Sequence, residues 1–157
     1  MLSSELVIRP ALKSDCKQLL VLMKKLAEFE DYLNDFRVTE DDLIEHGFPS
    51  DNRHPPTFYT IVAEQENQLL GYVVYYFIPF TYDLKPTLFI KELYINASSR
   101  GQKVGQKIML ATIEEAKEKG CGRMKWDVLN DNINAQEFYK QLGASYDSRW
   151  QGYVLNV

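Results

Sequence analysis

The stretch ELYINASSRGQKVGQK, residues 92–107, decides the fold of this chain. It begins as a β-rich run that ends at Asn96, continues through a polar turn with Arg100 and Gly101, and enters an amphipathic helix. A turn at a helix start directs a row of backbone N–H groups outward, beside the positive end of the helix dipole. Such a turn binds phosphate or pyrophosphate. Taken alone, the stretch is equally well explained as a tight structural turn with Gly101 at positive φ.

The turn does not follow the two commonest nucleotide-binding motifs. Lys103 is followed by Val104 and not by Ser or Thr, so the hydroxyl that binds magnesium in a P-loop is missing. The pattern GxGxxG and the matching acidic residue after a second strand are also missing, and this argues against a dinucleotide site. The ligand therefore has to be identified from a second motif.

Length and composition indicate one soluble globular domain. The chain has 157 residues, of which 45% are hydrophobic and 25% charged. Its 22 acidic residues outnumber its 18 basic residues, so neither nucleic acid nor an anionic membrane is an expected partner. The longest apolar run, residues 69–80, is too short to span a bilayer, and no signal peptide is visible.

Cysteine and histidine usage indicates neither disulfides nor a metal site. Cys16 and Cys121 are far apart and form no CxxC pair, as expected of buried thiols in a reducing compartment. The two histidines have no metal-ligand spacing. We therefore expect one domain over residues 1–157, located in the cytoplasm, with no metal, no nucleic acid and no membrane partner.

Hydrophobic periodicity and capping residues predict the order of the elements. Ser14 and Asp15 are suited to cap a helix that runs to about Asp31. Further helices are predicted at 39–47, 103–119 and 134–142, and strands at 5–9, 58–64, 68–78, 88–96 and 123–129, with strand residues at Tyr146 and 150–155. This order predicts a mixed sheet with helices on its faces.

The second motif is WDVLNDNINAQEFYKQLGA, residues 126–144. Asn132 stands at or just before a helix start, and Phe138 and Tyr139 lie two turns later. Together with RGQKVG after the strand ELYI, which resembles motif A ([QR]-x-x-G-x-[GA]), this motif B-like segment resembles the GNAT superfamily of acetyl-CoA-dependent N-acetyltransferases. The resemblance implies an α/β fold with a central mixed, mostly antiparallel sheet of about seven strands and about four flanking helices.

Within the superfamily the chain is most similar to the spermidine/spermine N-acetyltransferases and their bacterial relatives. The segments that carry this similarity include 26–30, 38–43, 58–59, 71–72 and 81–82. The similarity implies transfer of acetyl from acetyl-CoA to a primary amine of a small cationic acceptor, such as a polyamine, a diamine or a lysine-like amino acid. It also implies a homodimer. Two alternatives stay open: a protein amine or an aminoglycoside-like compound as acceptor, and a non-catalytic acyl-CoA sensor.

The resemblance also implies the contacts with acetyl-CoA. Backbone N–H groups of residues 102–106 would hold the pyrophosphate, and the edges of Tyr94 and Ile95 would pair with the pantetheine arm as an added strand would. Lys103 occupies a position where the family usually has Gly, and its N–H is expected to serve if its φ is negative. The predicted CoA-binding residues are Tyr94, Ile95, Arg100, Gly101, Gln102, Lys103, Val104, Gly105, Gln106, Lys107, Asn132 and Tyr139.

Catalysis needs an acid and a base. Tyr139 is the predicted general acid that protonates the departing CoA thiolate, and its alternative role is a core aromatic residue. The polyamine enzymes carry a carboxylate on the motif A strand, at the position that Lys91 occupies here. Glu92 is its neighbour, and strand alternation places Glu92 on the opposite face unless a β-bulge intervenes. Either Glu92 is re-aimed, or a water chain removes the proton, or the substrate differs.

Acidic residues between Glu28 and Glu45 stand against the single Arg37, and they would attract a cationic amine. A solubilising helix surface explains them as well. The resemblance places Glu28 and Glu30 near the acceptor. Tyr82 would hold a cation by its ring face. The predicted acceptor-binding residues are Glu28, Glu30, Tyr82 and Glu92.

Overall fold

The computed structural model describes residues 4–157. These residues form two compact units, a first that ends at Trp126 and a second over Asp127–Val157. The expected organisation as one domain stays a prediction.

The first unit is built on a sheet with the strand order β1-β2-β3-β4-β5. The strands are β1 (Val7–Pro10), β2 (Tyr59–Gln65), β3 (Gln68–Ile78), β4 (Thr87–Ile95) and β5 (Arg123–Trp126). The first four pair antiparallel with their neighbours, and β5 runs parallel to β4. The sheet is therefore mixed and mostly antiparallel, and this confirms the predicted α/β class.

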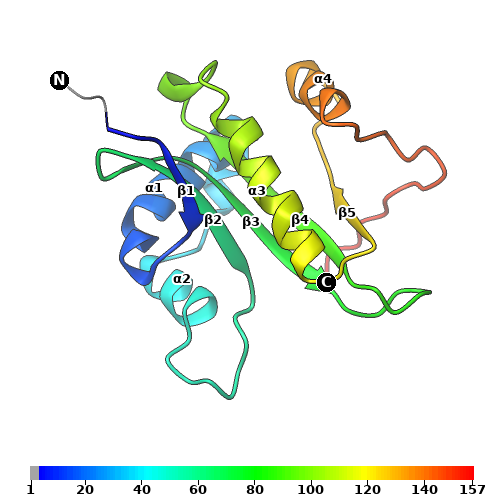
Figure 1. Cartoon of the computed structure of the whole chain (residues 1–157), viewed down its shortest axis with the longest axis horizontal. Helices are drawn as coiled ribbons and strands as arrows, with labels where there is room; N and C mark the ends of the chain where they lie inside the picture. Colours follow the sequence, from blue (N-terminus) through cyan, green and yellow to red (C-terminus); the bar gives the residue numbers. More distant parts are fainter. Residues whose placement is uncertain (1–3) are drawn as a thin grey trace. The chain divides into compact units, whose positions relative to one another are not determined.

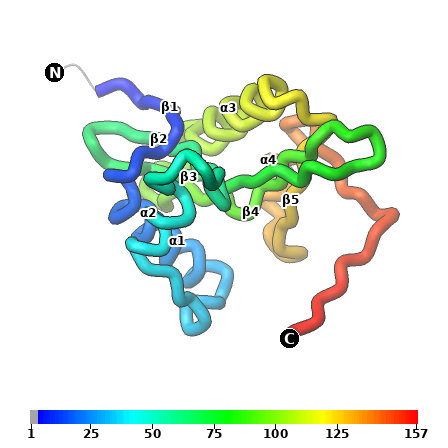
Figure 2. The backbone as a smooth tube through the Cα atoms, turned by 90° about the horizontal axis from the view of Figure 1, so that it is seen from below, coloured from blue at the N-terminus to red at the C-terminus, as the bar shows by residue number. Residues whose placement is uncertain are grey.

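Helices cover both faces of this sheet. The chain forms α1 (Cys16–Phe29), α2 (Glu40–Gly47) and α3 (Val104–Glu118), whereas α4 (Ile133–Gln141) belongs to the second unit. Three short 3-10 turns precede or follow them, at Lys13–Asp15, Leu33–Asp35 and Ala97–Ser99. Figure 1 follows the chain through these elements, and Figure 2 shows α3 on one side of the sheet and α1 and α2 on the other. The two long helices, α1 and α3, each bury an apolar stripe, for example Leu19, Leu22, Met23 and Leu26 on α1.

Two local features agree with the predicted helix at 39–47 and the predicted strands at 58–64 and 68–78. Thr39 and Asp42 form the capping box of α2, because the Asp42 N–H donates to Thr39 Oγ1 at 3.2 Å and the Thr39 N–H donates to Asp42 Oδ2 at 2.8 Å. Glu66 and Asn67 connect β2 to β3 with φ of 54° and 63°. Two central residues at positive φ match the twist of the hairpin strands.

The strand prediction is wrong at the C-terminal end of the chain. Among residues 4–157 the sheet has five strands and not about seven. Residues 145–157, all of them described, contain no strand, although Tyr146 and 150–155 were expected to supply strand residues. The strand predicted at 123–129 already ends at Trp126. Alternation gives a segment β-propensity, but a strand forms only where another strand offers hydrogen-bonding groups in register.

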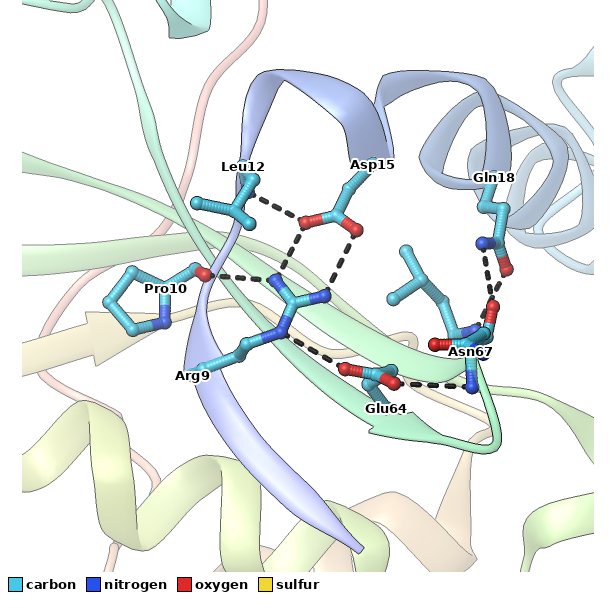
Figure 3. Close-up of polar contacts among 8 residues, drawn as sticks. Arg9, Pro10, Leu12, Asp15, Gln18, Glu64 and Asn67 are labelled. Atoms are coloured by element: carbon cyan, nitrogen blue, oxygen red, sulfur yellow. Dashed lines mark hydrogen bonds and ion pairs between the residues drawn. The ribbon is translucent and has the colours of Figure 1, made fainter.

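Arg9 ties three elements of the first unit together, as Figure 3 shows. Its guanidinium donates two hydrogen bonds to Asp15, at 2.8 and 3.1 Å, and one to Glu64 at 3.2 Å. Asp15 Oδ2 also accepts from the Leu12 N–H at 2.6 Å. Burial alone would raise the pKa of Asp15, but the hydrogen bonds from Arg9 and Leu12 and the Arg9 charge outweigh burial and lower it. The entry to α1 is thereby fixed against β1 and β2.

Candidate functional site

The predicted phosphate turn connects β4 to α3. Gly101 has a φ of 86°, and a Cβ added there would meet no atom within 4 Å. The first intrahelical bond of α3 runs from the Lys107 N–H to the Lys103 carbonyl at 3.1 Å. The N–H groups that precede this bond in the first turn are those of Val104, Gly105 and Gln106. Together with the helix dipole they form a site suited to a phosphate group.

Lys103 has a left-handed backbone conformation. Its φ is 60° and its ψ is 20°, and it is the N-cap residue of α3. The negative φ on which the use of its N–H was made conditional is therefore not present. The family usually has Gly at this position, and the turn retains the backbone conformation that favours Gly although a lysine occupies it. A non-Gly residue in this region costs about 1–2 kcal/mol.

Arg100 is held between a helix and a strand. Its guanidinium carbon lies 5.7 Å from the ring centroid of Phe29 on α1 and 5.9 Å from that of Tyr94 on β4. Its Nε donates to the Ile95 carbonyl at 3.3 Å. These contacts fix the position of Arg100 at the start of the turn.

One edge of β4 is open beside this turn. β3 pairs with β4 over 87–95, whereas β5 pairs with it only over 87–90. Among the described residues, no strand therefore pairs with 91–95 on the β5 side. The Asn96 N–H donates to the Leu70 carbonyl on the β3 side at 2.8 Å. Since polar groups alternate between the two edges of a strand, those of Ile95 face the open edge.

This register changes which residues can pair with an extended arm. Leu93 has the same parity as Ile95, so its N–H and carbonyl also face the open edge, whereas those of Tyr94 face β3. The Ile95 carbonyl already accepts from Arg100, and its N–H remains a donor for a ligand. Leu93 was missed because only the pairing with β3 reveals the parity.

A β-bulge at Lys91 re-aims Glu92. The pairs Val74↔Glu92 and Tyr75↔Ile90 follow each other directly, so Lys91 is an extra residue without a partner on β3. The extra residue reverses the alternation and places Glu92 on the same face as Val74, which packs in the core cluster with α1. The sequence left three possibilities open, and this geometry meets the condition for the first of them, in which Glu92 is re-aimed.

Glu92 lies in an acidic, half-buried environment. Its Oε2 accepts a hydrogen bond from the Tyr72 hydroxyl at 2.9 Å. Burial raises the pKa of Glu92 and the charge of Glu30 raises it further, whereas the Tyr72 hydrogen bond and the Lys91 charge act against the rise. A carboxyl with a raised pKa is suited to accept a proton near neutral pH.

The segment that follows α1 contributes Glu30 and Tyr32 to the surroundings of Glu92. Asp31 follows the helix with a φ of 63°, and the Tyr32 N–H returns to the Ala27 carbonyl at 2.8 Å. Burial, followed by the charges of Glu92 and Glu30, raises the pKa of Tyr32 to about 12. Glu92, Glu30 and Tyr32 therefore influence one another electrostatically, and we call them, with Tyr72, the acidic cluster. Tyr32 and Tyr72 were not singled out for this site from the sequence.

Two predicted acceptor residues lie apart from the acidic cluster. Glu28 is on the exposed side of the last turn of α1. Tyr82 is 91% exposed in the loop after β3. That loop closes beyond the pair Ile78↔Thr87, so Glu92 lies five residues further along β4, roughly 16 Å from the loop end. The role of Tyr82 as an acceptor contact stays a prediction.

The second unit contains the motif B residues. Asn132 caps α4, because its Oδ1 accepts from the Ala135 N–H at 3.2 Å, and the cap leaves its amide nitrogen to donate. The rings of Phe138 and Tyr139 lie 5.5 Å apart, tilted against each other. Gly143 ends the helix with a φ of 92°, and the Ala144 N–H returns to the Tyr139 carbonyl at 3.1 Å.

The structure offers neither a metal group nor a membrane helix in the part of the chain that it describes. Among residues 4–157, no three His, Cys, Asp or Glu side chains are placed to hold a metal ion. The helices in the same range are all too short or too polar to cross a membrane.

Comparison with known proteins gives one family. The sequence profile of the acetyltransferase (GNAT) family matches residues 22–144. Thialysine N-epsilon-acetyltransferase of Sus scrofa is 32% identical over 149 residues, which cover 90% of this chain and 85% of the relative. The spermidine/spermine N(1)-acetyltransferase-like protein 1 of Homo sapiens is 30% identical over 157 residues, or 94% of this chain and 22% of that protein.

Solved structures share the fold. An integron cassette protein of V. cholerae superposes with a TM-score of 0.78 at 24% identity, covering 97% of this chain and 93% of that chain. An aminoglycoside N-acetyltransferase in complex with CoA superposes with a TM-score of 0.74 at 19% identity, covering 98% and 97%. At these identities the likeness is one of fold alone.

Proposed function

This chain belongs to the GNAT family of acetyltransferases, and we propose that it moves an acetyl group from acetyl-CoA to a primary amine of a small cationic acceptor. The acceptor is a polyamine, a diamine or a lysine-like amino acid. The observation that carries this proposal is the re-aimed Glu92, which lies on the α1 side of the sheet and is subject to the negative charge of Glu30.

The acidic cluster supports a cationic acceptor. The charge of Glu30 acts against the ionised form of the half-buried Glu92, and a bound ammonium group would relieve this repulsion. The aromatic rings of Tyr72 and Tyr94, 6.4 Å apart, stand beside Glu92 on the same face. The name of the Sus scrofa relative refers to the ε-nitrogen of thialysine, and this supports a lysine-like acceptor in particular.

The turn after β4 supports acetyl-CoA as the co-substrate. GNAT acetyltransferases use acetyl-CoA, and the first turn of α3 presents the N–H groups of residues 104–106 to a phosphate. The open edge of β4 would pair with the pantetheine arm through Leu93 and Ile95. Acetyl-CoA supplies the thioester, and this chain orients it between the turn and the acidic cluster.

The proposed reaction is a direct transfer in a ternary complex. The acceptor ammonium gives a proton to Glu92, directly or through one water. The amine nitrogen then attacks the thioester carbon, and a backbone N–H at the end of β4 is the donor that we assign to the carbonyl oxygen. A C–N bond forms and the C–S bond breaks, so CoA leaves as a thiolate, and the nitrogen loses its second proton to water to give the neutral amide.

Tyr139 is the proposed acid for this thiolate. The support is its place in the motif B segment, where the N-x-x-A-x-x-F-Y pattern begins at Asn132. A phenol can give its proton to the departing sulfur. We also propose that residues 1–157 act as one acetyltransferase domain, because the family match over 22–144 includes parts of both units. A cytoplasmic homodimer is proposed from the resemblance to the polyamine enzymes.

A thiol-release assay with acetyl-CoA tests the acceptor class. The panel contains spermidine, putrescine, lysine, thialysine, an aminoglycoside and a basic peptide. We expect turnover with at least one of the first four amines. Turnover only with the aminoglycoside or the peptide would overturn the proposed acceptor class, and CoA binding without turnover on any amine would overturn the proposed transfer.

A matched pair of variants tests the acidic cluster. Glu30→Gln is expected to raise the KM for the amine about tenfold, the effect of losing one close charge pair, and to leave the KM for acetyl-CoA unchanged. Glu118→Gln removes the same charge from the exposed end of α3 and is expected to change neither. Equal effects of the two variants would contradict local steering by Glu30.

A further inference from the structure

Tyr72 is a buried phenol with a single defined task in the structure. Its side chain is fully buried (0% exposed) in the core cluster that β3 forms with α1. A buried hydroxyl needs a hydrogen-bond partner, and the acceptor that the structure gives it is Glu92 Oε2 at 2.9 Å. A Phe would fill the same space, so packing alone does not explain the hydroxyl.

The contact depends on the bulge. Tyr72 is paired with Tyr94, and Glu92 is paired with Val74, so Tyr72 and Glu92 are diagonal neighbours on one face of the sheet. If the strand alternated regularly from Ile90 through Lys91, Glu92 would point to the face that α3 covers, away from Tyr72. The bulge thus directs Glu92 to this face of the sheet, and the Tyr72 hydroxyl binds its carboxylate there.

We propose that Tyr72 is a positioning residue whose hydroxyl holds the Glu92 carboxylate in its ionised form and in a fixed orientation, ready to accept the proton of the acceptor ammonium. The inference rests on the proposed role of Glu92 as the base. It assigns to β3 a part in catalysis that neither the phosphate turn nor motif B contains.

The groups around Glu92 explain why such a donor is needed. Glu30, beyond the end of α1, repels the ionised carboxylate, and burial disfavours the charge as well. The phenol of Tyr32 faces both carboxylates from the same segment. On the other side, Lys91 contributes an attractive charge from the exposed bulge. The Tyr72 hydrogen bond is the largest influence that favours the charged form of Glu92.

The test is the pH dependence of kcat/KM in the full-length protein with the Tyr72→Phe substitution. Assays over about pH 5 to 9 use the best amine of the panel, so that ionisation of the free amine is the same for every variant. Removing the donor favours the protonated carboxyl, so the acidic limb is expected to move up by about one pH unit. The plateau at high pH is expected to change by less than about threefold, because the base itself is still present.

Tyr75→Phe is the matched control. Tyr75 is also buried and also on β3, but it points to the opposite face, where its ring lies 5.8 Å from those of Tyr59 and Phe77. The Tyr75→Phe substitution also removes one buried hydroxyl, and it is expected to leave the acidic limb of the kcat/KM profile at the same pH. A shift of equal size in both variants would overturn a specific role of Tyr72.

Glu92→Gln separates this inference from the proposed function. If Glu92 is the base, its acidic limb disappears in Glu92→Gln, and adding Tyr72→Phe to that variant changes the pH profile no further. A limb that persists in Glu92→Gln would overturn Glu92 as the base. A limb that disappears in Glu92→Gln but does not move in folded Tyr72→Phe would overturn only the inference about Tyr72.

A second substitution protects the test against a folding defect of Tyr72→Phe. Replacing Tyr72 by 3-fluorotyrosine makes the phenol more acidic and a stronger hydrogen-bond donor, with almost the same shape. The acidic limb is then expected to move to lower pH, opposite to the Phe variant. No movement, or movement to higher pH, would contradict the proposal.

Discussion

The guanidinium of Arg100 lies over the ring of Phe29, with its central carbon 5.7 Å from the ring centroid. Arg100 begins the phosphate turn, and Phe29 is the last residue of α1, next to Glu30 of the acidic cluster. The contact therefore joins the proposed CoA end of the site to the proposed acceptor end. Cation–π contacts at exposed places contribute about 0.5–1 kcal/mol.

Phe29→Leu is expected to raise the KM for acetyl-CoA two- to fivefold, roughly the weight of one such contact, and to leave kcat nearly unchanged. The reason is that Arg100 loses one of the two rings that orient it, while the acidic cluster keeps its residues. Initial rates at saturating amine measure both constants. Val21→Ala, at another exposed apolar position of α1, serves as the control. An unchanged KM in Phe29→Leu would show that Arg100 keeps its orientation without this ring.

Lys103→Gly is expected to stabilise the protein by about 1 kcal/mol, because the left-handed conformation no longer carries a Cβ penalty. Lys107→Gly, which removes the same charge one turn later inside α3, is expected to destabilise it by a similar amount. Urea unfolding of both variants measures the two free energies. Destabilisation by both substitutions would mean that the turn does not hold Lys103 at positive φ in solution.

The two motifs predicted more of the site than the periodicity did. The phosphate turn lies where the sequence placed it, because RGQKVG combines a glycine turn with a helix start over a few residues. The position of Glu92 was not predictable in this way. Strand alternation treats each residue alike, whereas the bulge at Lys91 arises from the pairing of β4 with β3, which are joined by a loop.

At the C-terminal end the sequence predicted strand residues that the structure does not contain. The aromatic residues Tyr146, Trp150 and Tyr153 gave a β-like pattern, yet no strand forms among residues 145–157. The capping box at Thr39 and the hairpin turn at Glu66 were predictable, because their hydrogen bonds connect residues a few positions apart. Hydrogen bonds between residues a few positions apart can be predicted from one segment of the sequence, whereas the pairing of a strand depends on a second segment.

Asp15→Asn is expected to lower the free energy of unfolding by about 2 kcal/mol at pH 7, because Arg9 loses its charged partner in a partly buried place. The pKa of Asp15 is lowered in the folded state, so its ionisation stabilises the fold above the unfolded pKa. This contribution disappears as the pH falls through the folded pKa. Urea unfolding at several pH values is therefore expected to show the two proteins converging below about pH 4.

Asp51→Asn is the control for that measurement. Asp51 pairs with Arg53 and His54, whose side chains are 87% and 78% exposed, so solvent screens these pairs. Little change in stability is expected at any pH. If Asp15→Asn behaved like this control, the Arg9 contacts would contribute no more than a surface ion pair.

Glu92→Gln is expected to make the protein more stable at neutral pH while it removes the proposed base. The pKa of Glu92 is raised by burial and by Glu30, so its share of stability is complete below the unfolded pKa and is lost as the pH rises through the folded pKa. Gln stays neutral and still accepts the hydrogen bond of Tyr72. Thermal unfolding is therefore expected to show equal stability of the two proteins near pH 4 and an advantage of about 1 kcal/mol for the variant above the folded pKa.

Glu118→Gln, at an exposed position, is expected to show no such trend. If Glu92→Gln were less stable than the wild type at neutral pH, the ionised carboxylate would be a stabilising group, and the electrostatic repulsion that we assign to the acidic cluster would be absent.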